Sequence, residues 1–307
     1  MSAGTEDTQL GAAHDFAEVN GVTLHYAHRG SGPLVLFLHG FPQCWYQFRH
    51  QLADLGEDNR AVAPDLRGYN LSSKPDDLRA YETCELVEDV RGLVEHLGVE
   101  RFVLAGHDVG GAVAWSFALH HPEMLEALIV LDTPHPAPFH EALSHDPDQQ
   151  EASSYMWTAR RPDAAEIFGA EDHKILREAL DEPFFEAETV EHYVRSWKQP
   201  GALEASMRWF HVEGQGPPAP DGTPAHGNIV RHIRPLTVTV PTLVMYGTAD
   251  PWIRPASHRA LERFVPELTF VEVDGASHWL PEEKPELVNA TIREFLAGVR
   301  GAAHSRG

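Results

Sequence analysis

Short runs of β-branched and aliphatic residues recur along this chain, and segments with helical spacing separate them. Residues 86–97, for example, place apolar side chains three or four positions apart. The turn pair Asn20-Gly21 joins the first two strand-like runs, 17–19 and 22–26, as a hairpin. The later strand-like runs are residues 34–38, 61–63, 102–105, 128–131, 242–246 and 268–273. This alternation predicts βαβ units and a mostly parallel central sheet flanked by helices on both faces.

The alternation stops between residues 134 and 234, where helical spacing, tryptophans and an acidic surface take its place. Such a block between two sets of strand-like runs indicates a helical cap inserted in an α/β core. The predicted core is therefore residues 15–133 and 235–300, and the predicted cap is residues 134–234. Residues 1–14 and 301–307 are predicted to be disordered tails.

The charge of the chain narrows the class of partner. The chain has 46 acidic and 24 basic side chains, which give a formal net charge of −22. A field of that sign repels nucleic acid and anionic membrane surfaces, so neither is an expected partner, whereas a small-molecule substrate is. No apolar run approaches the roughly 20 residues that span a bilayer, and the first residues lack the basic and apolar segments of a signal peptide. A cytoplasmic protein is expected, either a monomer or a homodimer.

Neither the cysteines nor the histidines indicate a metal site. The two cysteines, Cys44 and Cys84, provide no disulfide framework and no cysteine-based zinc spacing. The 20 histidines include no His-Glu-x-x-His pattern. The sequence therefore predicts neither a metal nor another cofactor.

The candidate chemistry begins directly after the strand-like run 102–105. The next segment, 106–111, has the sequence GHDVGG and leads into a helical run, residues 112–119. This is the strand, sharp turn and helix that present a nucleophile from a strained turn between small residues. Asp108 occupies the centre of the turn, so the predicted nucleophile is a carboxylate.

Three further strand ends carry the groups that a nucleophile needs. The sequence HGFP around Phe41 ends a strand-like run in a glycine turn, and the backbone amides of Phe41 and Val109 are the predicted oxyanion hole. Asp250 and His278 each follow a later strand-like run. The chain order of nucleophile, acid and histidine predicts a triad of Asp108, Asp250 and His278.

Several motifs in the chain resemble those of the soluble epoxide hydrolases and of the related haloalkane and fluoroacetate dehalogenases. The motifs are HGFP at 39–42, PDLRGY at 64–69, GHD at 106–108, LDTPHP at 131–136 and SHW at 277–279. The similarity extends from about residue 16 to residue 296 and implies the α/β-hydrolase fold. Together the motifs are specific for the superfamily and divide its members less sharply.

An aspartate nucleophile suits attack on an sp³ carbon that bears an epoxide oxygen or a halide, which gives an alkyl ester of Asp108. His278 would activate the water that hydrolyses this ester, with Asp250 holding the imidazole in its useful tautomer. An esterase is disfavoured, because a carboxylate that attacks an ester forms an anhydride. Asp132 is the alternative acid, since it also follows a strand-like run and some dehalogenases take the acid from that position.

The cap is expected to supply a proton or a strong hydrogen bond to the epoxide oxygen, because an alkoxide is a poor leaving group. The resemblance implies cap tyrosines for this role, commonly two. Tyr155 matches the first, whereas Phe210 stands in the place of the second, with His211 or Tyr193 as candidate substitutes. Val109 stands where the relatives carry Trp or Arg.

These residues favour an epoxide hydrolase that opens a moderately large, mostly neutral epoxide to a vicinal diol. Candidate substrate-binding residues are His39, Trp45, Trp157 and Phe210. The first alternative is a haloalkane or haloacid dehalogenase that uses the same covalent mechanism, with Trp157 or Trp45 as halide donor. The second is a member of the fold that binds a small molecule without catalysis.

Overall fold

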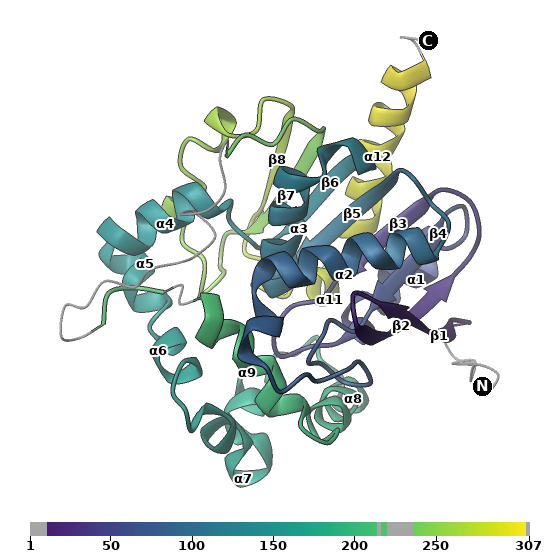
Figure 1. The fold of residues 1–307 in the computed structure, drawn as a ribbon. Helices are drawn as coiled ribbons and strands as arrows, with labels where there is room; N and C mark the ends of the chain where they lie inside the picture. The colour runs from purple at the N-terminus through teal and green to yellow at the C-terminus, as the bar shows by residue number, and fades with distance from the viewer. Residues whose placement is uncertain (1–10, 214–215, 220–235, 305–307) are drawn as a thin grey trace.

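The computed structural model describes residues 11–213, 216–219 and 236–304, and its centre is an eight-stranded sheet (Figure 1). The strands lie in the order β1-β2-β4-β3-β5-β6-β7-β8. Their bounds are Ala13–Val19 (β1), Val22–Arg29 (β2), Leu34–Leu38 (β3), Arg60–Pro64 (β4), Phe102–His107 (β5), Leu125–Leu131 (β6), Thr242–Gly247 (β7) and Leu268–Val273 (β8). β2 is antiparallel to β1 and β4, and the other pairings are parallel. The predicted mostly parallel sheet is confirmed.

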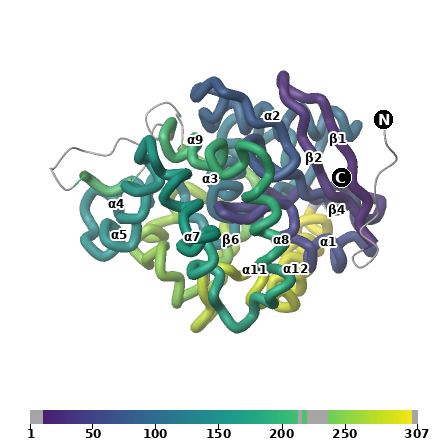
Figure 2. The backbone as a smooth tube through the Cα atoms, turned by 90° about the horizontal axis from the view of Figure 1, so that it is seen from below, coloured from purple at the N-terminus to yellow at the C-terminus, as the bar shows by residue number. Residues whose placement is uncertain are grey.

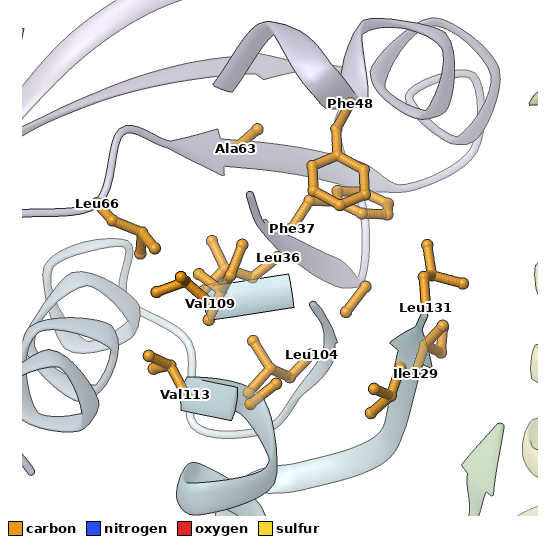
Figure 3. Close-up of a cluster of buried hydrophobic side chains, with 14 of the residues drawn as sticks. Leu36, Phe37, Phe48, Ala63, Leu66, Leu104, Val109, Val113, Ile129 and Leu131 are labelled. Carbon is orange, nitrogen blue, oxygen red and sulfur yellow. The ribbon is translucent and has the colours of Figure 1, made fainter. Parts of the chain in front are cut away.

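The central strands are apolar along their whole length because both faces of the sheet are covered. Every residue of β3 and of β5 is buried. Figure 3 shows side chains from these strands, such as Leu36 and Leu104, together with Val109 and Val113 of the following helix. This packing fixes the ends of the strands, from which the candidate site residues project.

Helices cover the two faces of the sheet in pairs. Helices α2 and α3 lie in front of the strands in Figure 1, whereas α1 and α12 lie behind them. In α12 the residues Val288, Ile292 and Leu296 recur every four positions and are buried, as an amphipathic helix requires. The bounds of the helices around the sheet are Arg49–Leu55 (α1), Thr83–His96 (α2), Asp108–His120 (α3), Leu280–Glu283 (α11) and Pro285–His304 (α12).

Between β6 and β7 the described chain forms a separate layer of helices, which we call the cap. Figure 2 is seen from the side of this layer and shows α7, α8 and α9 crossing the molecule, with α4 and α5 beside them. The bounds of these helices are Pro136–His145 (α4), Pro147–Ala152 (α5), Tyr155–Ala159 (α6), Ala164–Ala179 (α7), Ala187–Trp197 (α8) and Ala202–Glu213 (α9). They occupy the segment in which the strand-like alternation stops.

Several element ends differ from the prediction by a few residues, among them the following three. β6 begins at Leu125, where it pairs with Phe102 of β5, three residues before the predicted start. Ala13 and His14 pair with β2, so the first strand begins inside the predicted tail 1–14. At the other end α12 continues to His304, inside the predicted tail 301–307. An established helix can pass through one glycine, such as Gly301, at a cost of about 1 kcal/mol.

The rest of the predicted tails, residues 1–10 and 305–307, lies outside the described residues, as do positions 214–215 and 220–234 of the predicted cap. Among the helices of the described ranges, none combines the length and the apolar character needed to cross a membrane.

Candidate active site

Asp108 lies at the sharp turn between β5 and α3, on the edge of the sheet where the parallel strands end. Its φ of 51° is in the left-handed region, which residues other than glycine adopt at a cost. The turn needs small neighbours. A Cβ on Gly110 would lie 2.1 Å from the carbonyl oxygen of Leu38, and a Cβ on Gly106 would lie 2.4 Å from that of Gly110. The two glycines therefore let the chain present Asp108 from a crowded turn.

Two backbone amides hold the carboxylate of Asp108. The N–H of Phe41, in the loop after β3, donates to Asp108 Oδ1 at 2.7 Å. The N–H of Val109 also donates to this carboxylate. These are the two amides predicted to form an oxyanion hole, and they are fixed by the same loops that fix the nucleophile. Donors placed this way stabilise negative charge that develops on an oxygen at Asp108.

His278 bridges two carboxylates at the same edge of the sheet. Its Nδ1 lies 2.7 Å from Asp250 Oδ2. Its Nε2 lies 3.8 Å from Asp108 Oδ2, little more than a hydrogen-bond distance from the predicted nucleophile. The second oxygen of Asp250 accepts the N–H groups of Trp252 at 2.7 Å and Ile253 at 2.9 Å. The acid is thus held on both oxygens, which sets the orientation of the imidazole.

The charges of these groups are coupled. Burial opposes the imidazolium form of His278, but the carboxylates of Asp250 and Asp108 outweigh it and raise the pKa of His278 to about 9. Burial also raises the pKa of Asp108, against the opposing effects of His278 and the amides of Phe41 and Val109. At neutral pH the resting site therefore pairs an imidazolium with the Asp108 carboxylate.

A chain of hydrogen bonds joins the loops that carry Phe41, Asp108 and His278, and sequence reasoning missed it. Gln47 Oε1 accepts the N–H of Gly40 at 3.0 Å, and Gln47 Nε2 donates to His107 Nδ1 at 2.7 Å. His107 Nε2 in turn donates to the carbonyl oxygen of His278 at 2.8 Å. Gln47 belongs to a short 3₁₀ helix, Trp45–Phe48, where no motif marks it. The link fixes the oxyanion loop, the nucleophile turn and the histidine loop relative to one another.

A cavity lies over Asp108 between the core and the cap. Most of its lining is apolar, and its polar groups include two carboxylates, the Tyr155 phenol and an indole. Its lining residues are Asp108, Val109, Ala112, Asp132, Thr133, Pro134, Pro136, Phe139, Tyr155, Met156, Trp209, Phe210 and Ile253. An apolar cavity with a few convergent polar groups is the usual form of a small-molecule site.

The model of the family described as "alpha/beta hydrolase fold" matches residues 33–285. The chain belongs to the α/β-hydrolase family. Its sequence is 37% identical over 294 residues to the AB hydrolase superfamily protein YfhM of Bacillus subtilis, covering 93% of this chain and 98% of that protein. It is also 33% identical to epoxide hydrolase 3 of Xenopus tropicalis, covering 90% of this chain and 75% of that protein.

Solved structures extend the similarity. An epoxide hydrolase of Bacillus megaterium in complex with an inhibitor superposes with a TM-score of 0.85 at 32% identity, covering 92% of this chain and 100% of that one. A variant of that enzyme, solved with its product (R)-3-[1]naphthyloxy-propane-1,2-diol, gives the same TM-score, identity and coverage. Among the α/β-hydrolases, this chain therefore resembles the epoxide hydrolases.

Asp132, the alternative acid, lies at the cavity of this α/β-hydrolase but not on the histidine. Its Oδ1 accepts the N–H of Gly247 at 2.7 Å. Among the described residues, His278 pairs with Asp250 and Asp108 and makes no ion pair with Asp132. Burial, with a further contribution from the charge of Asp250, raises the pKa of Asp132 well above its usual value. The geometry assigns the contact with His278 to Asp250 and leaves Asp132 a buried acid beside it.

Three predicted substrate-binding residues do not line the cavity. His39 is buried, and its ring bonds two backbone groups: Nδ1 donates to the carbonyl of Gly40, and Nε2 accepts the N–H of Leu66 in the segment after β4, each at 3.0 Å. Trp45 is buried edge-on against His14. Trp157 donates its indole N–H to the carbonyl of Pro217 at 3.3 Å.

Phe210 does line the cavity, as predicted, and presents no donor there. Neither candidate substitute reaches it. The Tyr193 hydroxyl donates to the carboxylate of Glu282. The two ring nitrogens of His211 lie 2.9 Å and 3.0 Å from the carbonyl oxygens of Met207 and Arg161. The side chains that sequence reasoning missed in this lining include Trp209, which lies next to Phe210 in α9.

Proposed function

We propose that this chain is an epoxide hydrolase that opens a neutral epoxide to a vicinal diol through a covalent ester of Asp108. The observation that carries the proposal is the pairing of a carboxylate nucleophile with a phenol in one cavity: Asp108 and Tyr155 line the same space. The mainly apolar lining favours a neutral substrate, and the net charge of −22 disfavours an anionic one.

The first step joins the core and the cap. Asp108 Oδ2, the oxygen that does not accept the Phe41 amide, attacks an epoxide carbon, and the carbon–oxygen bond of the ring breaks. Tyr155 gives its phenolic proton to the departing oxygen. Burial, followed by the charges of Asp108 and Asp250, raises the pKa of Tyr155 well above its usual value, so the proton is present at neutral pH. The products are an alkyl ester of Asp108 and a hydroxyl group on the neighbouring carbon.

The second step uses the core alone. Formation of the ester removes the charge of Asp108, one of the anions that raise the pKa of His278, and so favours the neutral imidazole that acts as base. His278 takes a proton from water, and the hydroxide adds to the ester carbonyl. The amides of Phe41 and Val109 stabilise the oxyanion. Collapse of the intermediate breaks the bond to the alkoxide, which takes the proton of His278 and leaves as the diol. The Asp108 carboxyl formed in this step returns its proton to His278, and the Tyr155 phenolate regains from solvent the proton that the imidazolium lost when the ester formed.

The dehalogenase alternative has less support, because the predicted halide donors Trp157 and Trp45 are not placed for that role. Halide departure relies on ring N–H donors, and the indole of Trp157 already donates to Pro217 while Trp45 lies away from the cavity. A cytoplasmic location remains a prediction from the sequence.

Oxygen tracing tests the proposal. Excess enzyme is reacted for one turnover in ¹⁸O water with epoxides that include the naphthyl glycidyl ether corresponding to the diol bound by the B. megaterium enzyme. The label should appear in the peptide containing Asp108 and not in the first diol, because water attacks the ester carbonyl. His278→Gln should accumulate the ester, seen as a mass increase equal to the epoxide, and Asp108→Ala should form none.

Three outcomes would overturn the proposal. Label in the diol of the first turnover would mean direct attack of water on the epoxide. An enzyme inert toward every epoxide but releasing halide from a haloalkane or haloacid would be a dehalogenase. Inertness toward both substrate classes would leave the non-catalytic binding protein.

A further inference from the structure

Trp209 lines the cavity and carries an unused hydrogen-bond donor. The indole is 6% exposed, and its Nε1–H has no acceptor among the described residues. Other indoles in the described part of the chain are satisfied by carbonyl oxygens: Trp115 by that of Thr133 at 3.2 Å, and Trp197 by that of Pro42 at 2.5 Å. A buried donor without a partner is costly, so the Trp209 indole calls for an acceptor that arrives with a ligand.

The position of Trp209 indicates where in the cavity a ligand acceptor for its indole N–H would lie. Trp209 lines the same cavity as Asp108 and Tyr155, and it projects from α9 while Tyr155 projects from α6. Asp108 Oδ1 is already bonded by the Phe41 amide. A ligand atom held against the nucleophile can therefore meet donors from two different cap helices. In the proposed reaction the atom on which negative charge develops is the epoxide oxygen.

We propose that the indole N–H of Trp209 is a second hydrogen-bond donor to the epoxide oxygen, beside the hydroxyl of Tyr155. The inference rests on the proposed function and deepens it. As the bond from Asp108 to carbon forms, the electron pair of the breaking carbon–oxygen bond passes to the epoxide oxygen. Tyr155 transfers its proton to that oxygen, whereas Trp209 keeps its proton and holds the oxygen by a hydrogen bond. Trp209 then has no part in ester hydrolysis.

The neighbouring residue offers an internal rescue. Phe210 lines the cavity without a donor, and Phe210→Tyr would add a hydroxyl to the same wall. If Trp209 supplies a hydrogen bond, Phe210→Tyr should recover part of the loss caused by Trp209→Phe. A packing role for Trp209 predicts no such recovery. The matched control is Trp157→Phe, because this cap indole has its own acceptor in Pro217.

The experiment measures the two steps separately with a single epoxide. Ester formation is followed by intact mass in a single turnover, and ester hydrolysis by release of the diol. Trp209→Phe should slow ester formation about 10- to 100-fold, toward the lower end of the losses seen when one preorganised donor is removed. Its rate of ester hydrolysis should stay within about threefold of wild type, and Trp157→Phe should change neither step by more than that.

A second replacement guards against loss of folding. Substitution of the Trp209 indole by the isosteric benzothiophene ring removes the N–H and keeps the shape, so it should reproduce the slower ester formation without lowering the melting temperature. Ester formation at the wild-type rate in this variant would overturn the inference, as would an equal loss in both steps. If wild type itself forms no ester with any epoxide, the proposed function fails and the inference fails with it. If wild type forms the ester and the Trp209 variants form it at the same rate, only the role of Trp209 is refuted. If Trp209→Phe instead slows halide release from a haloalkane or haloacid and leaves the reaction with epoxides unchanged, the indole N–H binds a halide and the inference is wrong.

Discussion

The core and the cap contribute to the cavity by different means. In the core, the groups around Asp108 are bonded to backbone or to one another: the Phe41 amide to Asp108, His278 to Asp250, and Asp250 to two further amides. In the cap, Tyr155 and Trp209 are held by the packing of their helices, and the indole N–H of Trp209 has no acceptor in the described chain. The core site is complete without a ligand, whereas the cap side is completed by one.

This difference assigns the two halves of the proposed reaction to two parts of the molecule. A preorganised set of amides, base and acid suits hydrolysis of the ester, in which the charge develops next to Asp108. Donors on separate cap helices suit an oxygen that belongs to the substrate and leaves with the product. Substitutions in the core should therefore impair the second step, and substitutions in the cap should impair the first.

The largest effect is expected at the acid of the core. Asp250→Asn preserves the shape but presents the wrong group to His278 Nδ1, so the imidazole loses its useful tautomer, and ester hydrolysis should slow by about 10³- to 10⁴-fold. Ester formation should change much less, and the ester should accumulate. Single-turnover mass spectrometry measures both rates.

The comparison with Asp132 sharpens this test. Asp132→Asn keeps an acceptor for the Gly247 amide and removes only the ionisable carboxyl. Both rates should stay within about threefold of wild type, as for a substitution that removes no needed charge. A loss in Asp132→Asn equal to that in Asp250→Asn would transfer the role of the acid to Asp132.

The next largest effect is expected in the cap. Tyr155→Phe removes the phenolic proton and should slow ester formation by about 10²-fold, in the range usual for losing a general acid. Hydrolysis of an ester already formed should hardly change. Tyr26→Phe, on β2 and outside the cavity lining, is the control and should leave both steps intact. A Tyr155→Phe enzyme that forms the ester at the wild-type rate would remove Tyr155 as the acid and favour the dehalogenase alternative.

The difference between the core and the cap also explains how much of the site the sequence could predict. The ends of strands carry local signatures, because a sharp turn needs small residues around the side chain that it presents. The sequence GHDVGG at 106–111 therefore marked Asp108, and position after a strand marked Asp250 and His278, all of which the structure brings together. These contacts follow from the order of the strands in a parallel sheet.

Contacts between segments that are distant in the sequence have no local sequence signature. Gln47 joins Gly40 to His107 only because a 3₁₀ helix packs beside the nucleophile turn. The unsatisfied indole of Trp209 is a property of its surroundings and not of its neighbours in sequence. His39 is the opposite case. It is adjacent in sequence to Phe41, yet its two ring nitrogens bond the backbone of Gly40 and of Leu66, and it does not line the cavity.

The smallest effect concerns the stability of the core and follows from the charge of His278. Its ordinary pKa is 6.5, and in the folded protein the carboxylates raise that pKa to about 9. Between these values the folded state holds a proton that the unfolded state has lost. The stabilisation is therefore complete below about pH 6.5 and is lost as the pH rises through about 9. The free energy of unfolding should fall by up to about 1.4 kcal/mol per pH unit in this interval.

Urea unfolding of wild type and His278→Gln at intervals from about pH 6 to pH 10 isolates this contribution, since other titrating groups are common to both proteins. The difference in unfolding free energy between the two should shrink as the pH rises. Asp108→Asn should move the loss to lower pH, because it removes one of the carboxylates that raise the pKa of His278, while Tyr155→Phe in the cap should leave the profile unchanged. A wild type and a His278→Gln variant with parallel profiles would mean that His278 is neutral in the resting enzyme. The core would then hold its base ready before the ester forms, and the proposed coupling between loss of the Asp108 charge and activation of His278 would be wrong.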